Sequence, residues 1–356
     1  MKMPHHVISA DQFNPELLEE IFEEAERLRR IDEANPALSE KSLQGKIVPL
    51  LFWEPSTRTF ISSFNAVAKL GGILIPVLNA GKFSSVTKGE TLEDTIRTCA
   101  DLKADAIIMR HSEAGSAQKA ADILDKYAPW VHLFNAGDGK KEHPTQMGLD
   151  IYTIWRNKKE ALKKGELVVA LVGELSDSRV FHSDAKALIK WGIKKFILIS
   201  EKGNNLPKDI LAEAKKKKIP CIKTSDILEF AEEPDVWIFT RLQLERKKIF
   251  SKILKAFPFL RYWVRQNYNQ RFGMTRKLQV RMKSNALVMH PLPRVRDLPE
   301  WFDEDERAVY LSQGKGTESQ VTNGLYFRAA QLKLTLTGAQ NSGFYFSKTK
   351  SPSPHT

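Results

Sequence analysis

Residues 45–72 read GKIVPLLFWEPSTRTFISSFNAVAKLGG, in which an apolar run, a polar turn and a helical pattern follow one another. The run at 45–53 is short and apolar, as in a buried strand. Apolar residues at 60–70 recur at the spacing of one helix face, and two glycines close the segment. The stretch predicts a strand and a helix joined by a turn that contains Ser-Thr-Arg-Thr at 56–59.

The same alternation continues along the chain. Short apolar runs predict further strands at 71–78, 104–111, 130–137, 167–175, 195–200, 235–240 and 285–290. Helical patterns occur at 91–102, 116–127, 143–162, 181–192, 209–218, 225–233 and 324–336. Strands separated by helices of about 10–15 residues are typical of βαβ units and parallel sheets. We therefore expect an α/β fold with two doubly wound domains, each built on a parallel sheet and joined by interdomain helices.

The two series of strands suggest where the domains divide. We expect a first domain at 1–150 and a second at 151–321, with the helix at 143–162 between them. The closing helix at 322–337 is expected to pack back on the first domain. Residues 338–356 end in SKTKSPSPHT and are predicted to form a flexible tail.

Length and composition restrict the class of protein. A chain of 356 residues with 42% apolar and 28% charged residues suits a two-domain globular protein. It has no apolar run of about 18 residues, so no membrane span is predicted, and we expect no secretory signal. Only two cysteines, Cys99 and Cys221, are present, which excludes a disulfide framework and a cysteine-rich zinc module. A cytoplasmic location fits this cysteine usage.

The net charge of +12 has a local origin. Residues 246–283 contain twelve Lys/Arg and no Asp/Glu, so the rest of the chain is nearly neutral. A general affinity for nucleic acid or membranes is therefore weakly supported by the charge alone.

Polar side chains follow five of the predicted strands. These clusters are EPSTRT at 54–59, RH at 110–111, NAGDGKKEHPTQ at 135–146, TRLQLER at 240–246 and HPLPR at 290–294. Ligands of open α/β sheets bind outside the carboxyl ends of the strands. Any one cluster could be an ordinary surface turn, but five at such ends favour a binding site.

The turn at 56–59 has the composition of an anion site. Hydroxyl groups, free backbone N–H groups and the helix dipole at a helix start attract anions. Arg58 adds a guanidinium fork that suits phosphate. The turn lacks the glycines of a P-loop, and an N-cap beside a solvated arginine remains the structural alternative.

Two other segments admit both a functional and a structural interpretation. SSVTKGETLEDT at 84–95 offers Ser84 and Lys88 as mobile anion donors, or a helix cap with an exposed lysine. His143 could serve a site or simply begin a helix. No HExxH or CxxC pattern accompanies the histidines, so no metal site is predicted.

Taken together, these motifs resemble a known family. FWEPSTRT, SSVTKGETLEDT, IMRH, LFNAGDG with HPTQMGLD, TRLQLER and VMHPLPR are similar, in order and spacing, to the aspartate carbamoyltransferases of the aspartate/ornithine carbamoyltransferase family. The resemblance extends over residues 5–337. STRT and HPTQ are shared by carbamoyltransferases generally, whereas TRLQLER and HPLPR resemble the aspartate branch. Ornithine enzymes typically carry His-Cys-Leu-Pro where Pro291 stands here.

The resemblance implies a carbamoyl phosphate site in the first domain. The expected phosphate ligands are Ser56, Thr57, Arg58 and Thr59, with Ser84 and Lys88. The carbamoyl group is expected to contact Arg110, His143 and Gln146, and its carbonyl oxygen to accept from Thr59, Arg110 and His143. Pro291 and Leu292 are expected to offer backbone carbonyls to the amine and carbamoyl nitrogens.

It also implies an aspartate site and a shared assembly. The expected aspartate ligands are Arg179, Arg241, Gln243 and Lys88, and the expected supporting residues, which orient neighbouring arginines, are Glu54 and Arg246. In this family the loop that carries Ser84 and Lys88 reaches into the neighbouring subunit's site, which implies a homotrimer with shared active sites. Any zinc-bearing regulatory chain, or a dihydroorotase partner, would be a separate polypeptide.

The expected activity transfers the carbamoyl group from carbamoyl phosphate to the amine of L-aspartate. The products are N-carbamoyl-L-aspartate and phosphate, in de novo pyrimidine biosynthesis, and the resemblance implies no cofactor. The two substrates carry about four negative charges together. The cations expected to balance them are Arg58, Lys88, Arg110, Arg179 and Arg241.

The sequence departs from the family pattern in two places. Residues 247–277 form a basic, aromatic-rich segment longer than in compact bacterial members, and 314–321 is a second insertion. The first segment could form a lid, dock a partner protein or bind nucleic acid. We favour the lid or the protein partner over nucleic acid, because no nucleic-acid-binding motif accompanies it.

Two other functions compete with this interpretation. One is a carbamoyltransferase for another amino acid. The other is a basic scaffold or nucleic-acid-binding protein that has lost its activity. The complete set of cations argues against the second, because buried arginines without a use are costly.

Overall fold

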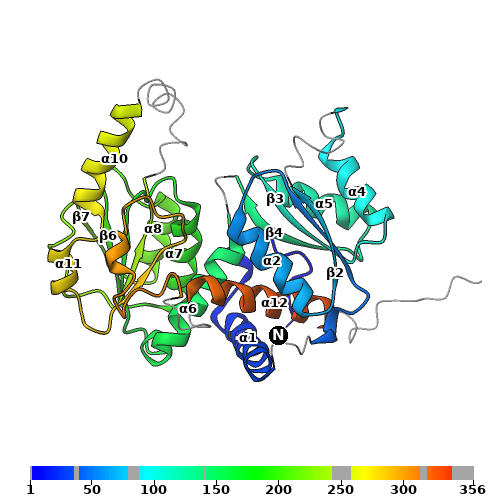
Figure 1. Ribbon diagram of the computed structural model, residues 1–356, viewed down its shortest axis with the longest axis horizontal. Coiled ribbons are helices and arrows are strands. Elements are labelled where there is room, and N and C mark those ends of the chain that lie inside the picture. The colour runs from blue at the N-terminus through cyan, green and yellow to red at the C-terminus, as the bar shows by residue number, and fades with distance from the viewer. Residues whose placement is uncertain are drawn as a thin grey trace, which may run out of the picture.

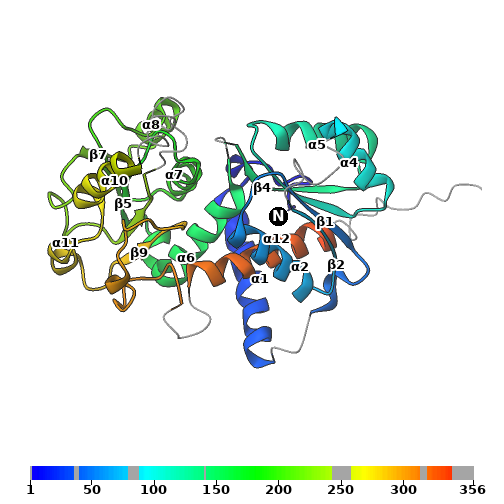
Figure 2. The ribbon, with the colours of Figure 1, turned by 45° about the horizontal axis from the view of Figure 1, so that its top comes forward.

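The structure is a computed structural model that describes residues 2–35, 40–78, 88–139, 142–242, 258–312 and 319–338. Two α/β lobes lie side by side, and two helices, α6 (Pro144–Lys163) and α12 (Gln320–Gly338), lie between them (Figure 1). The same arrangement is visible from a second direction (Figure 2).

The first lobe is built on a four-stranded parallel sheet. Its strands are β1 (Ile47–Phe52), β2 (Ile73–Leu78), β3 (Ala106–His111) and β4 (His132–Asp138), in the order β2-β1-β3-β4. Its helices are α1 (Pro15–Ala34), α2 (Thr57–Lys69), α4 (Leu92–Asp101) and α5 (Ser116–Tyr127), with short 3-10 turns η1 (Ala10–Gln12) and η2 (Lys41–Leu43).

The second lobe contains a five-stranded parallel sheet. Its strands are β5 (Val168–Val172), β6 (Lys195–Ile199), β7 (Cys221–Thr224), β8 (Val236–Phe239) and β9 (Leu287–Met289), in the order β7-β6-β5-β8-β9. Its helices are α7 (Arg179–Trp191), α8 (Lys208–Lys216), α10 (Pro258–Phe272) and α11 (Arg276–Arg281), and η5 (Glu300–Phe302) is a 3-10 turn. The predicted α/β fold with two parallel sheets is confirmed.

One predicted helix was wrong. Residues 225–233 form turns. Side chains at the start of this segment accept hydrogen bonds from nearby backbone N–H groups, and these bonds compete with those of a helix. The Thr224 hydroxyl accepts from the N–H of Asp226 at 2.9 Å, and the Asp226 carboxylate accepts from the N–H of Leu228 at 2.9 Å.

Four of the α-helices and β-strands had no sequence prediction. β7 is a short edge strand of mixed polarity, whereas α1 had readable signals in its Asn14 cap, its Pro15 start and a buried apolar face. The other two, α10 and α11, lie within the stretch at 246–283 that contains no acidic residue.

An apolar core runs through both lobes and is continued by α6 and α12. α12 packs against α1, α2 and α6. Gly148 in α6 makes room for the ring of Phe327 in α12, because a Cβ at this glycine would lie 1.9 Å from a ring carbon. This close contact fixes α12 across α6, and so sets where α12 meets the ends of the second sheet.

No helix within the described ranges is both long and apolar enough to cross a membrane.

The α6–α12 contact gives a stability prediction. Gly148→Ala should destabilise the protein by about 1–3 kcal/mol, because the added methyl group overpacks the Phe327 ring. Gly338→Ala, at the far end of α12, is the matched control, since a Cβ there meets open space. Urea unfolding of both variants measures the difference, and equal midpoints for Gly148→Ala and the wild type would contradict the packing argument.

Candidate active site

The carboxyl ends of strands from both sheets face a cleft of about 770 Å³ between the lobes. The segments that line it follow β1, β3 and β4 in the first lobe and β8 and β9 in the second. The starts of α6 and α7, together with α12, complete the wall. The strand ends predicted to carry polar clusters therefore converge on one cavity.

The turn between β1 and α2 opens a helix N-terminus toward this cleft. Ser56 is the N-cap residue, yet its side chain makes no cap hydrogen bond. The first turn of α2 contains no acidic residue, and Ser56, Thr57, Arg58 and Thr59 all line the cleft. Unsatisfied N–H groups and hydroxyls at such an end form a site for an anion.

Arg58 on this turn is close to a cation from the other lobe. Burial lowers the pKa of Arg58, and the positive charge of Arg241 lowers it further. Arg241 follows β8 and also lines the cleft. The two guanidinium groups therefore repel each other across the cavity until an anion lies between them.

Arg110, at the end of β3, is held from two sides. Its Nη1 donates to the carbonyl of Ala136 at 3.1 Å, and its Nη2 lies 2.8 Å from the Glu54 carboxylate. Gly137, with φ of +131°, permits this approach because a Cβ there would lie 2.7 Å from Nη1. The guanidinium plane is fixed by the backbone of the neighbouring strand.

Arg179 begins α7 in the second lobe and reaches the first. Its Nη1 donates to the carbonyl of Gly139, and its Nη2 lies 3.7 Å from the Glu54 carboxylate. Burial and the charge of Arg110 lower the pKa of Arg179 to about 10. Glu54 therefore bridges two buried arginines that come from different lobes.

His143 caps α6 and is held neutral. Its Nδ1 accepts from the N–H of Gln146 at 3.3 Å, so the ring proton of the neutral form lies on Nε2. Burial lowers the pKa of His143 well below its ordinary value, and the charges of Arg179 and Arg110 act in the same direction. His143 is thus a hydrogen-bond donor over the whole physiological pH range.

The segment after β9 is braced by a buried histidine. The N–H of Leu292 donates to Nδ1 of His290 at 2.7 Å, and Nε2 of His290 donates to Asp297 at 2.5 Å. Leu292 has φ of +54°, and Pro291 and Leu292 both line the cleft. Their backbone is thereby held at the cavity wall.

One predicted site residue, Lys88, does not line this cleft in the structure, and three others cannot be placed. Lys88 is exposed and does not line the cavity of its own chain. Ser84, Gln243 and Arg246 lie outside the described residues. Gln146 lines the cleft, as do all the other predicted residues.

Sequence reasoning missed the contribution of α12. Arg328 and Gln320 both line the cleft. Arg328 donates to the Gly324 carbonyl at 2.9 Å and to the Thr145 hydroxyl at 3.3 Å, and burial lowers its pKa to about 10. The available signal was an arginine inside the apolar stretch GLYFRAA at 324–330 of the predicted closing helix.

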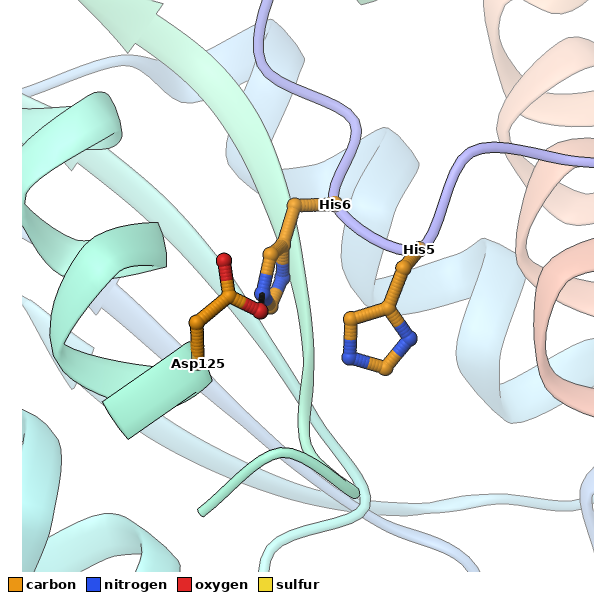
Figure 3. Close-up of side chains that lie close together, drawn as sticks. All are labelled: His5, His6 and Asp125. Atoms are coloured by element: carbon orange, nitrogen blue, oxygen red, sulfur yellow. Dashed lines mark hydrogen bonds and ion pairs between the residues drawn. The ribbon is translucent and has the colours of Figure 1, made fainter. Parts of the chain in front are cut away.

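A group of histidines near the N-terminus has the spacing of a metal site. Among the described residues, ligand atoms of His5, His6 and Asp125 lie within 4.8 Å of one another (Figure 3). However, Nδ1 of His6 accepts from the N–H of Leu133 at 3.0 Å, so Nε2 carries the proton and donates to Asp125 at 3.3 Å. Because the lone pair that a metal needs is not free, we assign no metal site here.

The geometry of the cleft suits anionic ligands. Within the part of the chain that the structure describes, Arg58, Arg110, Arg179, Arg241 and Arg328 line the cleft together with one carboxylate. A helix N-terminus, a neutral histidine donor and fixed backbone carbonyls complete it. Fold and site together define a two-domain α/β protein with an anion-binding cleft between its lobes.

Comparison with known proteins assigns the family. Residues 5–156 match "Aspartate/ornithine carbamoyltransferase, carbamoyl-P binding domain" and residues 165–335 match the "Asp/Orn binding domain" of the same family. The chain belongs to the aspartate/ornithine carbamoyltransferase family.

Individual relatives point to the aspartate members. The chain is 37% identical to a chloroplastic aspartate carbamoyltransferase of Arabidopsis thaliana, over 93% of this chain and 78% of the relative. It is also 37% identical to an aspartate carbamoyltransferase catalytic subunit of Methanothrix thermoacetophila, over 93% and 98% of the two chains.

Solved structures agree with this. The aspartate transcarbamoylase of Trypanosoma cruzi in complex with N-(phosphonacetyl)-L-aspartic acid superposes with a TM-score of 0.78 at 30% identity, covering 92% of this chain and 95% of that one. The catalytic subunit of the M. jannaschii enzyme gives a TM-score of 0.79 at 33% identity, covering 96% of this chain and all of the other.

Proposed function

We propose that this protein is a carbamoyltransferase that transfers the carbamoyl group of carbamoyl phosphate to the amine of L-aspartate. The products are N-carbamoyl-L-aspartate and phosphate, and the reaction belongs to de novo pyrimidine biosynthesis. The observation that carries the proposal is the convergence of five arginines on one cleft, in a chain whose similar relatives are named aspartate carbamoyltransferases.

Carbamoyl phosphate is assigned to the first lobe. The open start of α2 and Arg58 are suited to its phosphate, and the fixed donors Arg110 and His143 are suited to its carbonyl oxygen. Thr59 is a third donor to that oxygen, and Gln146 faces the carbamoyl nitrogen. Donors already in place when charge develops on the oxygen are worth about 3 kcal/mol each.

Aspartate is assigned to the second lobe. Arg179 and Arg241 would bind its two carboxylates, assisted by Gln243 and by Lys88 of a neighbouring subunit. The carbonyls of Pro291 and Leu292 would orient its amine. We infer accordingly that 1–150 with the closing helix forms the carbamoyl phosphate domain, and that 151–321 forms the aspartate domain.

The reaction then needs few further groups. The amine nitrogen forms a bond to the carbonyl carbon, and the carbonyl electron pair moves to the oxygen. When the tetrahedral intermediate collapses, the bond from carbon to the phosphate oxygen breaks and phosphate leaves with that electron pair. The amine proton passes to the leaving phosphate, so the protein need not supply a base. Excluding water protects the labile anhydride.

We also infer that the active site is shared between subunits of a homotrimer. Lys88 is exposed and does not line the cleft of its own chain, although it lies in the SSVTKGET motif. On the preceding edge strand, Ile73, Ile75 and Leu78 are 51%, 44% and 48% exposed. An apolar sheet edge of this kind favours a covering partner, and a second copy would bring Lys88 to the phosphate.

Three other expectations stay predictions. A regulatory or dihydroorotase partner would be a separate chain. The protein is expected in the cytoplasm, although its plant relatives are named chloroplastic. The basic segment at 247–277 is expected to form a lid or to dock a partner protein. Its helix α10 is joined to the loop after β9 by a hydrogen bond from Asn269 to the Val295 carbonyl at 2.8 Å.

Product analysis tests the proposed activity. With carbamoyl phosphate and aspartate, the purified protein should release phosphate and form N-carbamoyl-aspartate in equal amounts. With ornithine it should form no citrulline, since the second lobe offers arginines for two carboxylates. Phosphate release without aspartate is the control for hydrolysis. Formation of citrulline would show that ornithine is an acceptor and would contradict the assignment of aspartate. If neither amino acid is carbamoylated, a scaffold protein without activity is favoured.

A complementation experiment tests the shared site. Lys88→Ala and Arg58→Ala proteins should each be nearly inactive, because each lacks one phosphate cation. Dissociated, mixed and reassembled, they should regain partial activity where a wild-type Lys88 meets a wild-type Arg58 on another chain. If mixed trimers whose composition is verified by mass spectrometry stay inactive, the shared active site is refuted. It is also refuted if the active wild-type protein sediments as a monomer at the assay concentration.

A further inference from the structure

Two aspartates that the proposed reaction does not use are buried behind the cleft. Asp150 lies on α6 and Asp184 on α7, where these two helices pack against each other between the lobes. Both side chains are fully buried, with 0% exposure. Two adjacent carboxyl groups in such a place are costly unless they are protonated or hydrogen-bonded.

Asp150 accepts hydrogen bonds from two glutamines of the cleft wall. Nε2 of Gln146 lies 3.1 Å and 3.2 Å from its two carboxylate oxygens, and Nε2 of Gln320 lies 2.5 Å from one of them. Asp184 faces Asp150, and its oxygens have no other hydrogen-bond partner within the described residues. A proton between the two carboxyl groups satisfies both.

The surrounding charges favour such a proton. Burial raises the pKa of Asp150 to about 7, and burial together with the charge of Asp150 raises the pKa of Asp184 well above its ordinary value. The facing cation is Arg328 of α12, which also faces Arg110 of β3. One guanidinium group, which also has Arg110 as a neighbour, does not balance two carboxylates.

We propose that Asp150 and Asp184 form one proton-sharing pair that positions Gln146 for the carbamoyl group and couples it to the His290–Leu292 segment of the second lobe. The proposal rests on the proposed function, and it adds a positioning role for two residues that touch no substrate. Such a pair would align the parts of one site that come from the two lobes.

The direction of each hydrogen bond explains the positioning. Since Nε2 of Gln146 donates to Asp150, its Oε1 is left to accept from the carbamoyl nitrogen in the cleft. Since Nε2 of Gln320 donates to the same carboxylate, its Oε1 accepts from the N–H of His290 at 2.9 Å. The Asp150 carboxylate therefore orients both the Gln146 oxygen in the first lobe and, through Gln320, the backbone at His290 in the second lobe.

The pair makes the reaction sensitive to alkaline pH. A carboxyl group with a raised pKa keeps its proton until the pH rises through that raised value. Above it, two buried carboxylates repel each other, α6 and α7 separate locally, and both glutamines lose their alignment. Activity should therefore fall on the alkaline side of neutrality, not on the acid side.

The pH dependence of kcat/KM for carbamoyl phosphate, at saturating aspartate, tests this role. Asp184→Asn supplies a permanent amide donor to Asp150, so its alkaline limb should move up by about one pH unit or more. Asp209→Asn, an exposed aspartate on α8, is the matched control and should follow the wild type. Superimposable alkaline limbs for Asp184→Asn and the wild type would overturn the proposal.

A second variant and a spectroscopic readout keep the test independent of folding and of turnover. Asp150→Asn has one acceptor oxygen for two glutamines, so kcat/KM should fall by about 10²-fold, while phosphate binding at Arg58 is retained.

At pH 7.5 the infrared carbonyl band of a protonated carboxylic acid should be present in the wild type and absent in Asp184→Asn. An absent wild-type band overturns the pair even if aspartate is carbamoylated, whereas a present band with no N-carbamoyl-aspartate formed overturns the proposed function alone.

Discussion

Five guanidinium groups line one cleft of this protein, and Glu54 supplies the single carboxylate among the described residues that line it. Like charges removed from water repel one another and lose their hydration. Burial accordingly lowers the pKa of Arg58, Arg179 and Arg328. The fold has to hold these groups in place without an equal number of carboxylates, and this constraint explains much of the architecture around the site.

Backbone carbonyls provide most of the compensation. Arg110, Arg179 and Arg328 donate to the carbonyls of Ala136, Gly139 and Gly324. These oxygens orient the arginines but bring no full charge, so the cleft stays positive. Because Arg179 comes from the second lobe while Glu54 and Gly139 belong to the first, the same contacts also join the lobes. A dianionic phosphate and a dicarboxylate would then turn repulsion across the cleft into attraction.

Much of the fold, and the ligand-facing turns, could be predicted from sequence because local patterns determine them. The turn at 56–59 follows a short apolar strand, and His143 precedes a proline at a helix start, so periodicity and capping suffice. The helix predicted at 225–233 failed because bonds from side chains to the backbone outweighed helical spacing there.

The contributions that the sequence did not reveal depend on tertiary packing. Arg328 lines the cleft from α12, which lies close against α6 where Gly148 makes room for the Phe327 ring. Asp150 and Asp184 are 34 positions apart and meet only where α6 packs on α7. Neither pairing leaves a periodic signal in one segment, so propensity and spacing could not have predicted them.

The charge balance of the cleft is tested most directly by the thermal stability of Glu54→Gln with and without N-(phosphonacetyl)-L-aspartate. Without ligand, the variant should be less stable by about 1–2 kcal/mol, because Arg110 and Arg179 lose their shared carboxylate. Saturating ligand should remove most of this difference, since its own anionic groups replace that charge. Glu93→Gln, which affects only a half-exposed ion pair with Arg97, should stay close to the wild type throughout. A deficit that ligand leaves unchanged, or no deficit at all, would contradict the account.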